Sequence, residues 1–193
     1  YPMELTWFFY SVAATLLFGV AMAFYKLPSA KNYNLFVTTF WSLVTPAILA
    51  FIFFNSYLSL GTPALIWTAL VWGITFTCTV LLQMYALSHV DTNVLFPITT
   101  VASLIITVLI GIFFFNEHIS ILQAFGIVLA IVTIFSFLYK GGKILYSGLL
   151  IGVGSGIILI STFNKVLQKI AVDKFDIHVF LIYQFFFAAI FAL

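Results

Sequence analysis

The side chains that could carry out chemistry are few in this sequence, and most of them stand alone. Charged residues make up only 6% of the chain, and one polar break, at 116–120, sets Glu117 and His118 between two long apolar runs. A carboxylate in apolar surroundings could relay protons if it faced a water-filled path. Glu117 also suits a turn before a helix, where the helix dipole favours a carboxylate by about 0.3–1 kcal/mol. We interpret Glu117 as a turn residue.

The glycine-rich segment GVGSG at 152–156 superficially resembles a nucleotide-binding loop or the turn that carries a nucleophilic serine. Both motifs need a strand before a helix, whereas this segment lies inside a long apolar run. An intramembrane protease would also pair Ser155 with a buried histidine, and all three histidines stand at the ends of apolar runs. A retinal-type protein would need a lysine deep in the last helix, where only Lys174 stands, at its start.

The remaining reactive residues do not form a site either. The single cysteine, Cys78, excludes a disulfide framework and a cysteine-rich metal site. Nowhere do Cys, His, Asp and Glu residues cluster with the spacing of a catalytic or metal centre. We therefore expect no enzyme activity, no bound metal and no cofactor.

Composition explains why polar residues are so scarce. The chain of 193 residues is 64% hydrophobic, whereas soluble domains are roughly 45–50% apolar and about 25% charged. A soluble fold of this size could not bury so much apolar surface, so we expect an integral membrane protein whose solvent is lipid. The net charge is only +2 and the chain has no arginine, so nucleic acid is not expected as a partner.

Hydropathy divides the chain into segments long enough to span a membrane as helices. A spanning helix needs about 20 mostly apolar residues, and helices satisfy their own backbone groups in lipid. We predict an all-α integral membrane protein, a polytopic helix bundle with seven spans. The predicted spans are 4–26, 33–55, 63–88, 92–115, 120–139, 144–168 and 175–193.

Two local patterns add detail to this prediction. Ser120 and Gln123 have the spacing of a capping box, so Ser120 is expected to cap the fifth helix. Small residues also recur every four positions, which allows helices to approach closely in lipid. These small-residue stripes are Ser11, Thr15, Gly19 and Ala23; Ala69, Gly73 and Thr77; Thr99, Ser103, Thr107 and Gly111; and Gly148, Gly152 and Gly156.

The region 83–137 carries a recognisable order of elements. It contains QMYALSHVDTNVLFPITT at 83–100, a fourth helix rich in small residues, and NEHISILQAFG at 116–126. Ala86 and Leu87 close the third helix, Glu117 occupies the next turn, and Ser120, Gln123 and Gly126 open the fifth helix. This order resembles the end of an EamA domain in the drug/metabolite transporter superfamily.

The resemblance implies a fold and a function for the whole chain. Residues 3–140 would be a first EamA-like five-helix repeat, and 143–193 the first two helices of a second, truncated repeat in a ten-helix inverted-repeat transporter. The chain would then be a fragment of a plasma (inner) membrane protein. The implied function is secondary transport of a small metabolite, as an exporter or permease, by alternating access around a site between the repeats.

Polar and aromatic residues at membrane depth are the candidates for binding a substrate. They are Trp41, Trp72, Gln83, Asn93, Thr100, Asn164, Tyr183 and Gln184. Each has a structural alternative: Thr100 could bond its own helix backbone, Asn93 could cap the fourth helix, and Asn164 could lie at the membrane interface. No carboxylate or arginine lies at mid-membrane, so a neutral or zwitterionic substrate is expected unless Lys26 or Lys165 turns inward.

A different class of function stays open at this point. The same helix bundle could be a non-transporting membrane scaffold, an assembly factor or a lipid-handling protein. The expected partners are the lipid bilayer and a small-molecule substrate, and a homodimer is an open alternative. Saturable flux of a soluble metabolite would separate the transporter from these other classes.

Overall fold

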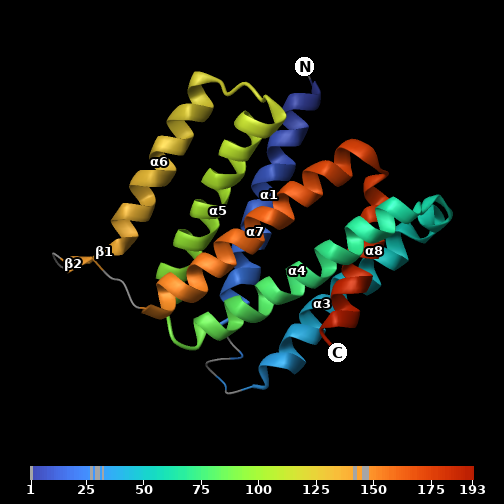
Figure 1. Ribbon diagram of the computed structural model, residues 1–193, viewed down its shortest axis with the longest axis horizontal. Helices are drawn as coiled ribbons and strands as arrows, with labels where there is room; N and C mark the ends of the chain where they lie inside the picture. The colour runs from blue at the N-terminus through green and yellow to red at the C-terminus, as the bar shows by residue number, and fades with distance from the viewer. Residues whose placement is uncertain (1, 27, 29–30, 32, 141–142, 145–147) are drawn as a thin grey trace.

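The computed structural model describes residues 2–26, 28, 31, 33–140, 143–144 and 148–193, which form a bundle of helices (Figure 1). A helix lies in each of the seven predicted segments. The elements in chain order are α1 (Pro2–Phe24), α3 (Leu35–Phe54), the 3-10 helix η1 (Asn55–Leu60), α4 (Pro63–Leu87), α5 (Thr92–Phe115), α6 (Ile121–Leu138), β1 (Tyr139–Lys140), β2 (Lys143–Ile144), α7 (Gly148–Lys174) and α8 (Ile177–Phe191).

Four helical segments of the described chain are long enough and apolar enough to cross a membrane. They are Leu35–Leu58, Pro63–Leu87, Thr92–Phe115 and Ile151–Lys174. Shorter apolar helices cover Ile121–Thr133 and Ile177–Phe191. A membrane protein built from a helix bundle is therefore indicated, while the count of seven spans, the repeat boundaries and the particular membrane stay predictions.

Side-chain caps explain where several helices begin. Asn34 accepts hydrogen bonds from the backbone of Phe36 and Val37 at the start of α3. The Ser120 hydroxyl accepts from the Gln123 backbone at 3.2 Å, and the Gln123 side chain accepts from the Ser120 backbone at 2.8 Å. The predicted capping box is thus confirmed, and it satisfies backbone donors that a helix start otherwise leaves unpaired.

The sixth helix differs from its predicted span of 144–168. A two-residue antiparallel pairing joins Tyr139–Lys140 to Lys143–Ile144, so α7 begins only at Gly148. The Gly141–Gly142 pair, predicted as the break between spans, lies outside the described residues. At its other end α7 continues past 168 to Lys174, and Lys169 in this extension pairs with Glu117.

The core follows a row of neighbouring helices. α6 packs on α5, α5 on α7, α7 on α4, α4 on α8, and α8 on α3. α4 takes part in all three clusters of buried residues, for example through Ala69, Val80 and Ala86. It is therefore the central helix of the bundle, with α6 at one edge (Figure 1).

Two of the four small-residue stripes lie at helix contacts. Ala69, Gly73 and Thr77 are buried, and the Thr77 hydroxyl is 3.0 Å from the backbone oxygen of Ala188 on α8. Ser103 of the α5 stripe is buried against α7.

The other two stripes pack less than predicted. A Cβ placed at Gly19 on α1 or at Gly152 on α7 would have no atom within 4 Å. A four-residue spacing of small residues permits close packing, but it does not determine which face of a helix meets a neighbour.

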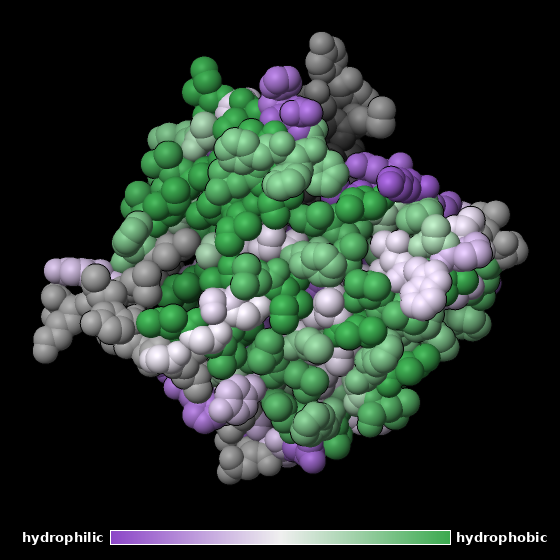
Figure 2. Space-filling model, viewed as in Figure 1, coloured by the Kyte–Doolittle hydropathy of each residue, from purple (hydrophilic) through white to green (hydrophobic). Residues whose placement is uncertain are grey.

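The outer surface is largely apolar. Figure 2 shows hydrophobic side chains over most of one face, with hydrophilic residues mainly toward its rim. On α6 the exposed fraction reaches 92% for Ile121 and 80% for Leu122. Water would disfavour such a surface, whereas lipid tails would not, which agrees with a membrane setting.

Candidate functional site

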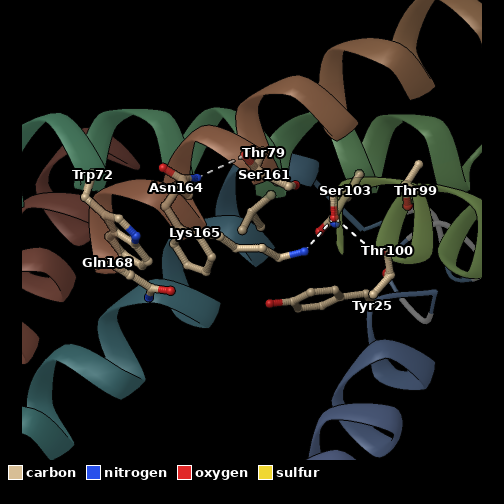
Figure 3. Close-up of a pocket in the computed structure, with 13 residues that line it drawn as sticks. Tyr25, Trp72, Thr79, Thr99, Thr100, Ser103, Ser161, Asn164, Lys165 and Gln168 are labelled. Atoms are coloured by element: carbon tan, nitrogen blue, oxygen red, sulfur yellow. Dashed lines mark hydrogen bonds between the residues drawn. The ribbon is translucent and has the colours of Figure 1, made fainter. Parts of the chain in front are cut away.

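A cavity of about 280 Å³ lies between α4, α5 and α7, with Tyr25 completing its lining after the end of α1 (Figure 3). Polar and aromatic side chains face it, although it lies inside an apolar bundle. The lining residues are Tyr25, Trp72, Phe76, Thr79, Val80, Gln83, Thr99, Thr100, Ser103, Ser161, Asn164, Lys165 and Gln168.

Lys165 brings a charge into this cavity. Its Nζ lies 2.6 Å from the hydroxyl oxygen of Ser103 on α5, and its side chain is directed across the cavity toward Tyr25 and Ser103 (Figure 3). The Ser103 hydroxyl in turn donates to the backbone oxygen of Thr100 at 2.9 Å. Because that hydroxyl proton is already used, Ser103 accepts from Lys165, and the pair joins α7 to α5.

Asn164 lines the cavity but uses its amide to hold helices together. Its Oδ1 accepts from the Thr75 hydroxyl, and its Nδ2 lies 3.5 Å from the hydroxyl of Thr79. Both threonines belong to α4, and Asn164 is only 5% exposed. The amide therefore fixes α7 against α4 beside the cavity.

The aromatic side of the cavity is formed by Trp72 and Phe76. Their rings stack with centroids 4.3 Å apart, and Phe185 of α8 meets Trp72 edge-on at 5.7 Å. Trp72 is 2% exposed, and its indole Nε1 has no hydrogen-bond partner among the described residues. A buried indole N–H normally has an acceptor, so this donor is an exception that calls for an explanation.

The lining has an unbalanced charge. Lys165 is its one charged residue, and no Asp or Glu lies among the described lining residues. Two other lysines form ion pairs outside the cavity: Lys26 with Asp91 at 3.7 Å, and Lys169 with Glu117. Lys26 therefore does not turn inward, whereas Lys165 does.

The structure brings four of the eight predicted binding residues to this cavity: Trp72, Gln83, Thr100 and Asn164. Whether any of them binds a substrate stays a prediction. Gln83 is 9% exposed and Thr100 is half-buried. Both come from helices that pack against α7, which explains why residues distant in sequence meet here.

The other four predicted residues lie outside the cavity. Trp41 is 60% exposed on the outer side of α3, and Asn93 is exposed in the first turn of α5, where Asp91 occupies the N-cap position. Tyr183 packs against Gly61 and stacks on Phe187. Gln184 is buried in α8 with an unpartnered Oε1.

The sequence contained a signal for the lining residues of α7 that were missed, Ser161, Lys165 and Gln168. Together with the predicted Asn164 they follow the spacing i, i+3, i+4 and i+7, so the four share one face of α7. A polar stripe on an otherwise apolar helix indicates a face turned toward a cavity or a polar partner. The prediction treated these residues one by one and overlooked the stripe.

A second hollow, of about 700 Å³, lies between α5 and α6. Apolar residues of both helices line it, with Glu117, His118 and Gln123 at one end. Glu117 is not only a turn residue: it pairs with Lys169 of α7, whose Nζ also lies 4.9 Å from the centre of the Phe115 ring.

The described residues contain no group of three or more His, Cys, Asp or Glu that could hold a metal ion. The absence of a cofactor and of enzyme activity stays a prediction. Comparisons with protein-family models, with curated proteins and with solved structures give no match to this chain. The EamA-like resemblance therefore rests on its sequence pattern alone.

Proposed function

We propose that this chain is a secondary transporter that moves a small zwitterionic or neutral metabolite across a membrane. The observation that carries the proposal is the polar cavity between apolar helices, since polar groups at membrane depth are costly and commonly mark a solute path. Lys165, Gln83 and Thr100 supply hydrogen-bonding groups from three helices. A bilayer-facing surface surrounds them.

The sequence resemblance supports the same proposal from another direction. We propose membership of the drug/metabolite transporter superfamily, with a first repeat at 3–140 and the start of a second at 143–193. In an inverted-repeat transporter the substrate lies near the midplane, between the repeats. The cavity agrees with that layout because α4 and α5 belong to the first proposed repeat and α7 to the second.

The test is solute flux in liposomes that contain the purified full chain. Radiolabelled amino acids, small carboxylates and polyols would be offered singly, with protein-free liposomes as the baseline. The proposal predicts saturable uptake of at least one solute, and faster uptake when unlabelled solute is preloaded. Uptake indistinguishable from protein-free liposomes for every solute would contradict it.

A matched pair of variants assigns flux to the cavity. Thr100→Val removes a hydroxyl that faces the cavity, and Thr45→Val removes one on the exposed side of α3 that bonds only its own helix at 2.9 Å. We expect Thr100→Val to raise KM about fivefold, the effect of one lost hydrogen bond of about 1 kcal/mol. Thr45→Val should leave KM unchanged.

The hollow between α5 and α6 favours a second candidate, a lipid-handling protein. Leu104, Val108 and Ile127 offer an apolar wall open to the side of the bundle, and Gln123 and Glu117 offer polar contacts at one end. A lipid tail would fit the apolar wall, and a lipid headgroup would fit the polar end. Extraction or flipping of a fluorescent phospholipid by the liposome-embedded chain, without soluble-solute flux, would favour this candidate over the transporter.

A further inference from the structure

We propose that the cavity recognises a small carboxylate, whose charged group is bound by the ammonium group of Lys165. This inference rests on the proposed transport function and revises its substrate class: it excludes uncharged solutes as the main substrates and adds simple organic acids to the zwitterions. The carboxylate belongs either to a simple organic acid or to an amino acid.

Lys165 has hydrogen-bond donors that no described residue accepts from. An ammonium group has three N–H donors and no acceptor. One donor meets the Ser103 hydroxyl at 2.6 Å, and no other partner for Nζ lies among the described residues. Ser103 holds the side chain across the cavity, so the ammonium group is positioned with donors still available to a ligand (Figure 3).

Lys165 also carries a positive charge that no described lining residue balances. Lys165 enters the cavity without a counterion, since the described lining has no Asp or Glu and Glu117 pairs with Lys169 instead. An unpaired cation among apolar helices is unfavourable, and the binding of an anion relieves that cost. A single positive charge matches a monoanion better than a doubly charged phosphate ester.

The aromatic side of the cavity contributes shape and not a donor. The Nε1 atom of Trp72 has no hydrogen-bond partner among the described residues, but it has almost no accessible surface, so the free charged donors in the cavity belong to Lys165. The stacked rings of Trp72 and Phe76 add an apolar wall for the body of the ligand.

The size of the cavity limits the ligand. A volume of about 280 Å³ corresponds to roughly nine water molecules at about 30 Å³ each. Ligands with on the order of ten non-hydrogen atoms match this volume, whereas a nucleotide or a phospholipid would extend beyond it. Benzoate and its uncharged amide, benzamide, are therefore suitable probes, because they have nearly the same shape and differ in charge.

The experiment measures binding of benzoate and benzamide to the purified full chain in detergent by calorimetry. We expect benzoate to bind at least tenfold more tightly than benzamide. Lys165→Met should weaken benzoate binding by about 10- to 100-fold, the range for a hydrogen bond to a charged group, and should leave benzamide binding unchanged. Unchanged benzamide binding would show that Lys165→Met is folded, and Lys165→Arg should restore most of the benzoate binding because Arg keeps the positive charge.

Lys174→Met is the matched control, because Lys174 is exposed at the end of α7 and outside the cavity. It should bind benzoate like the unaltered chain. Equal binding of the two probes, no binding of either, or an unchanged benzoate affinity in Lys165→Met would overturn the inference. Liposome flux on the same preparations separates the two proposals: saturable uptake of polyols alone leaves transport standing, and benzoate binding without any flux leaves only the carboxylate site.

Discussion

Glu117, in the loop after α5, forms an ion pair with Lys169 on α7. The two side chains are 49% and 33% exposed, so the pair lies at the surface of the bundle and not inside it. It connects the α5–α6 turn to a helix more than fifty positions further along the chain. Glu117 therefore has two structural roles, as a turn residue and as a partner of α7, and neither requires proton transfer.

Replacing Glu117 by Gln should have a small effect on stability. Solvent screens a pair this exposed, so the expected loss in the free energy of unfolding is about 0.2–1 kcal/mol. At about 1 M salt, where the screening length falls to about 3 Å, the difference should nearly vanish. Chemical unfolding of both proteins in detergent, at low and high salt, measures this.

A double-mutant cycle with Lys169→Gln isolates the pair. The coupling energy should be smaller than the loss for Lys169→Gln alone, because Lys169 also contacts the Phe115 ring. A loss above about 3 kcal/mol for Glu117→Gln that salt does not reduce would mean that the pair is buried in the membrane-embedded protein.

Gly111 makes room for the Glu117 carboxylate. A Cβ at position 111 would lie 2.5 Å from Glu117 Oε2, the far end of a flexible side chain. Gly111→Ala should therefore displace the carboxylate, and the loss of the ion pair should roughly cancel the gain of Ala over Gly in a helix, so that the free energy of unfolding changes little. In a Glu117→Ala background only the gain remains, and Gly111→Ala should stabilise the protein by up to about 1 kcal/mol.

Gly126→Ala is the control for Gly111→Ala, since a Cβ at Gly126 on α6 would meet no atom within 4 Å. It should stabilise the protein in both backgrounds by about 0.5–1 kcal/mol. If Gly111→Ala is equally destabilising with and without Glu117, the obstacle is the helix backbone and not the carboxylate.

The positions of the helices could be predicted from the sequence, because each is a long apolar run with a local start signal such as Ser120 with Gln123. The neighbours of each helix could not be predicted. Lipid tails are as apolar as leucine side chains, so the sequence does not show which face of a helix is buried against another helix. Trp41 and Trp72 illustrate this: both stand in apolar helices, yet Trp41 is 60% exposed and Trp72 only 2%.

Only half of the predicted binding residues line the cavity, because the sequence does not show which face of each helix is turned toward it. Single polar residues at membrane depth, such as Gln83 and Thr100, were identified by type alone. Lys165 was treated as a residue near a helix end, because α7 was expected to stop at 168 and in fact continues to Lys174. The extra length of α7 places Lys165 away from the helix end. Lys165 lies on the same face of α7 as Ser161 and Gln168, and this face is directed to the cavity.

Gly73 sets the separation of α4 and α8. A Cβ there would lie 2.7 Å from the Phe187 Cβ and 2.8 Å from the Ala188 backbone nitrogen, neither of which can rotate away. Gly73→Ala should force the helices apart, weaken the Thr77 bond to the Ala188 oxygen, and cost about 1–3 kcal/mol. Thermal unfolding in detergent reports this loss.

Gly152→Ala serves as the comparison for Gly73→Ala, because a Cβ at Gly152 would meet open space. It should leave the unfolding temperature unchanged or raise it slightly. Similar unfolding temperatures for the two variants would show that α4 and α8 are not in close contact when the protein lies in detergent.

Asn164 and Gln83 both line the cavity, yet the structure predicts different consequences for their replacement. The Asn164 amide is committed to Thr75 and Thr79, so Asn164→Ala should lower stability, with a coupling to Thr75→Val of about 0.6 kcal/mol, typical of hydrogen bonds between helices in membranes. Its effect on substrate KM should be small.

Gln83→Leu should change substrate binding and not stability. Gln83 faces the cavity and has no hydrogen bond to another helix among the described residues, so its loss should raise KM for the transported solute while the unfolding temperature changes little. Measuring the unfolding temperature and the liposome flux of both variants distinguishes a cavity residue that holds helices together from one that binds the solute. A raised KM with unchanged stability for Asn164→Ala would mean that the amide leaves its threonine partners to contact the solute, so that the bridge between α4 and α7 opens during transport.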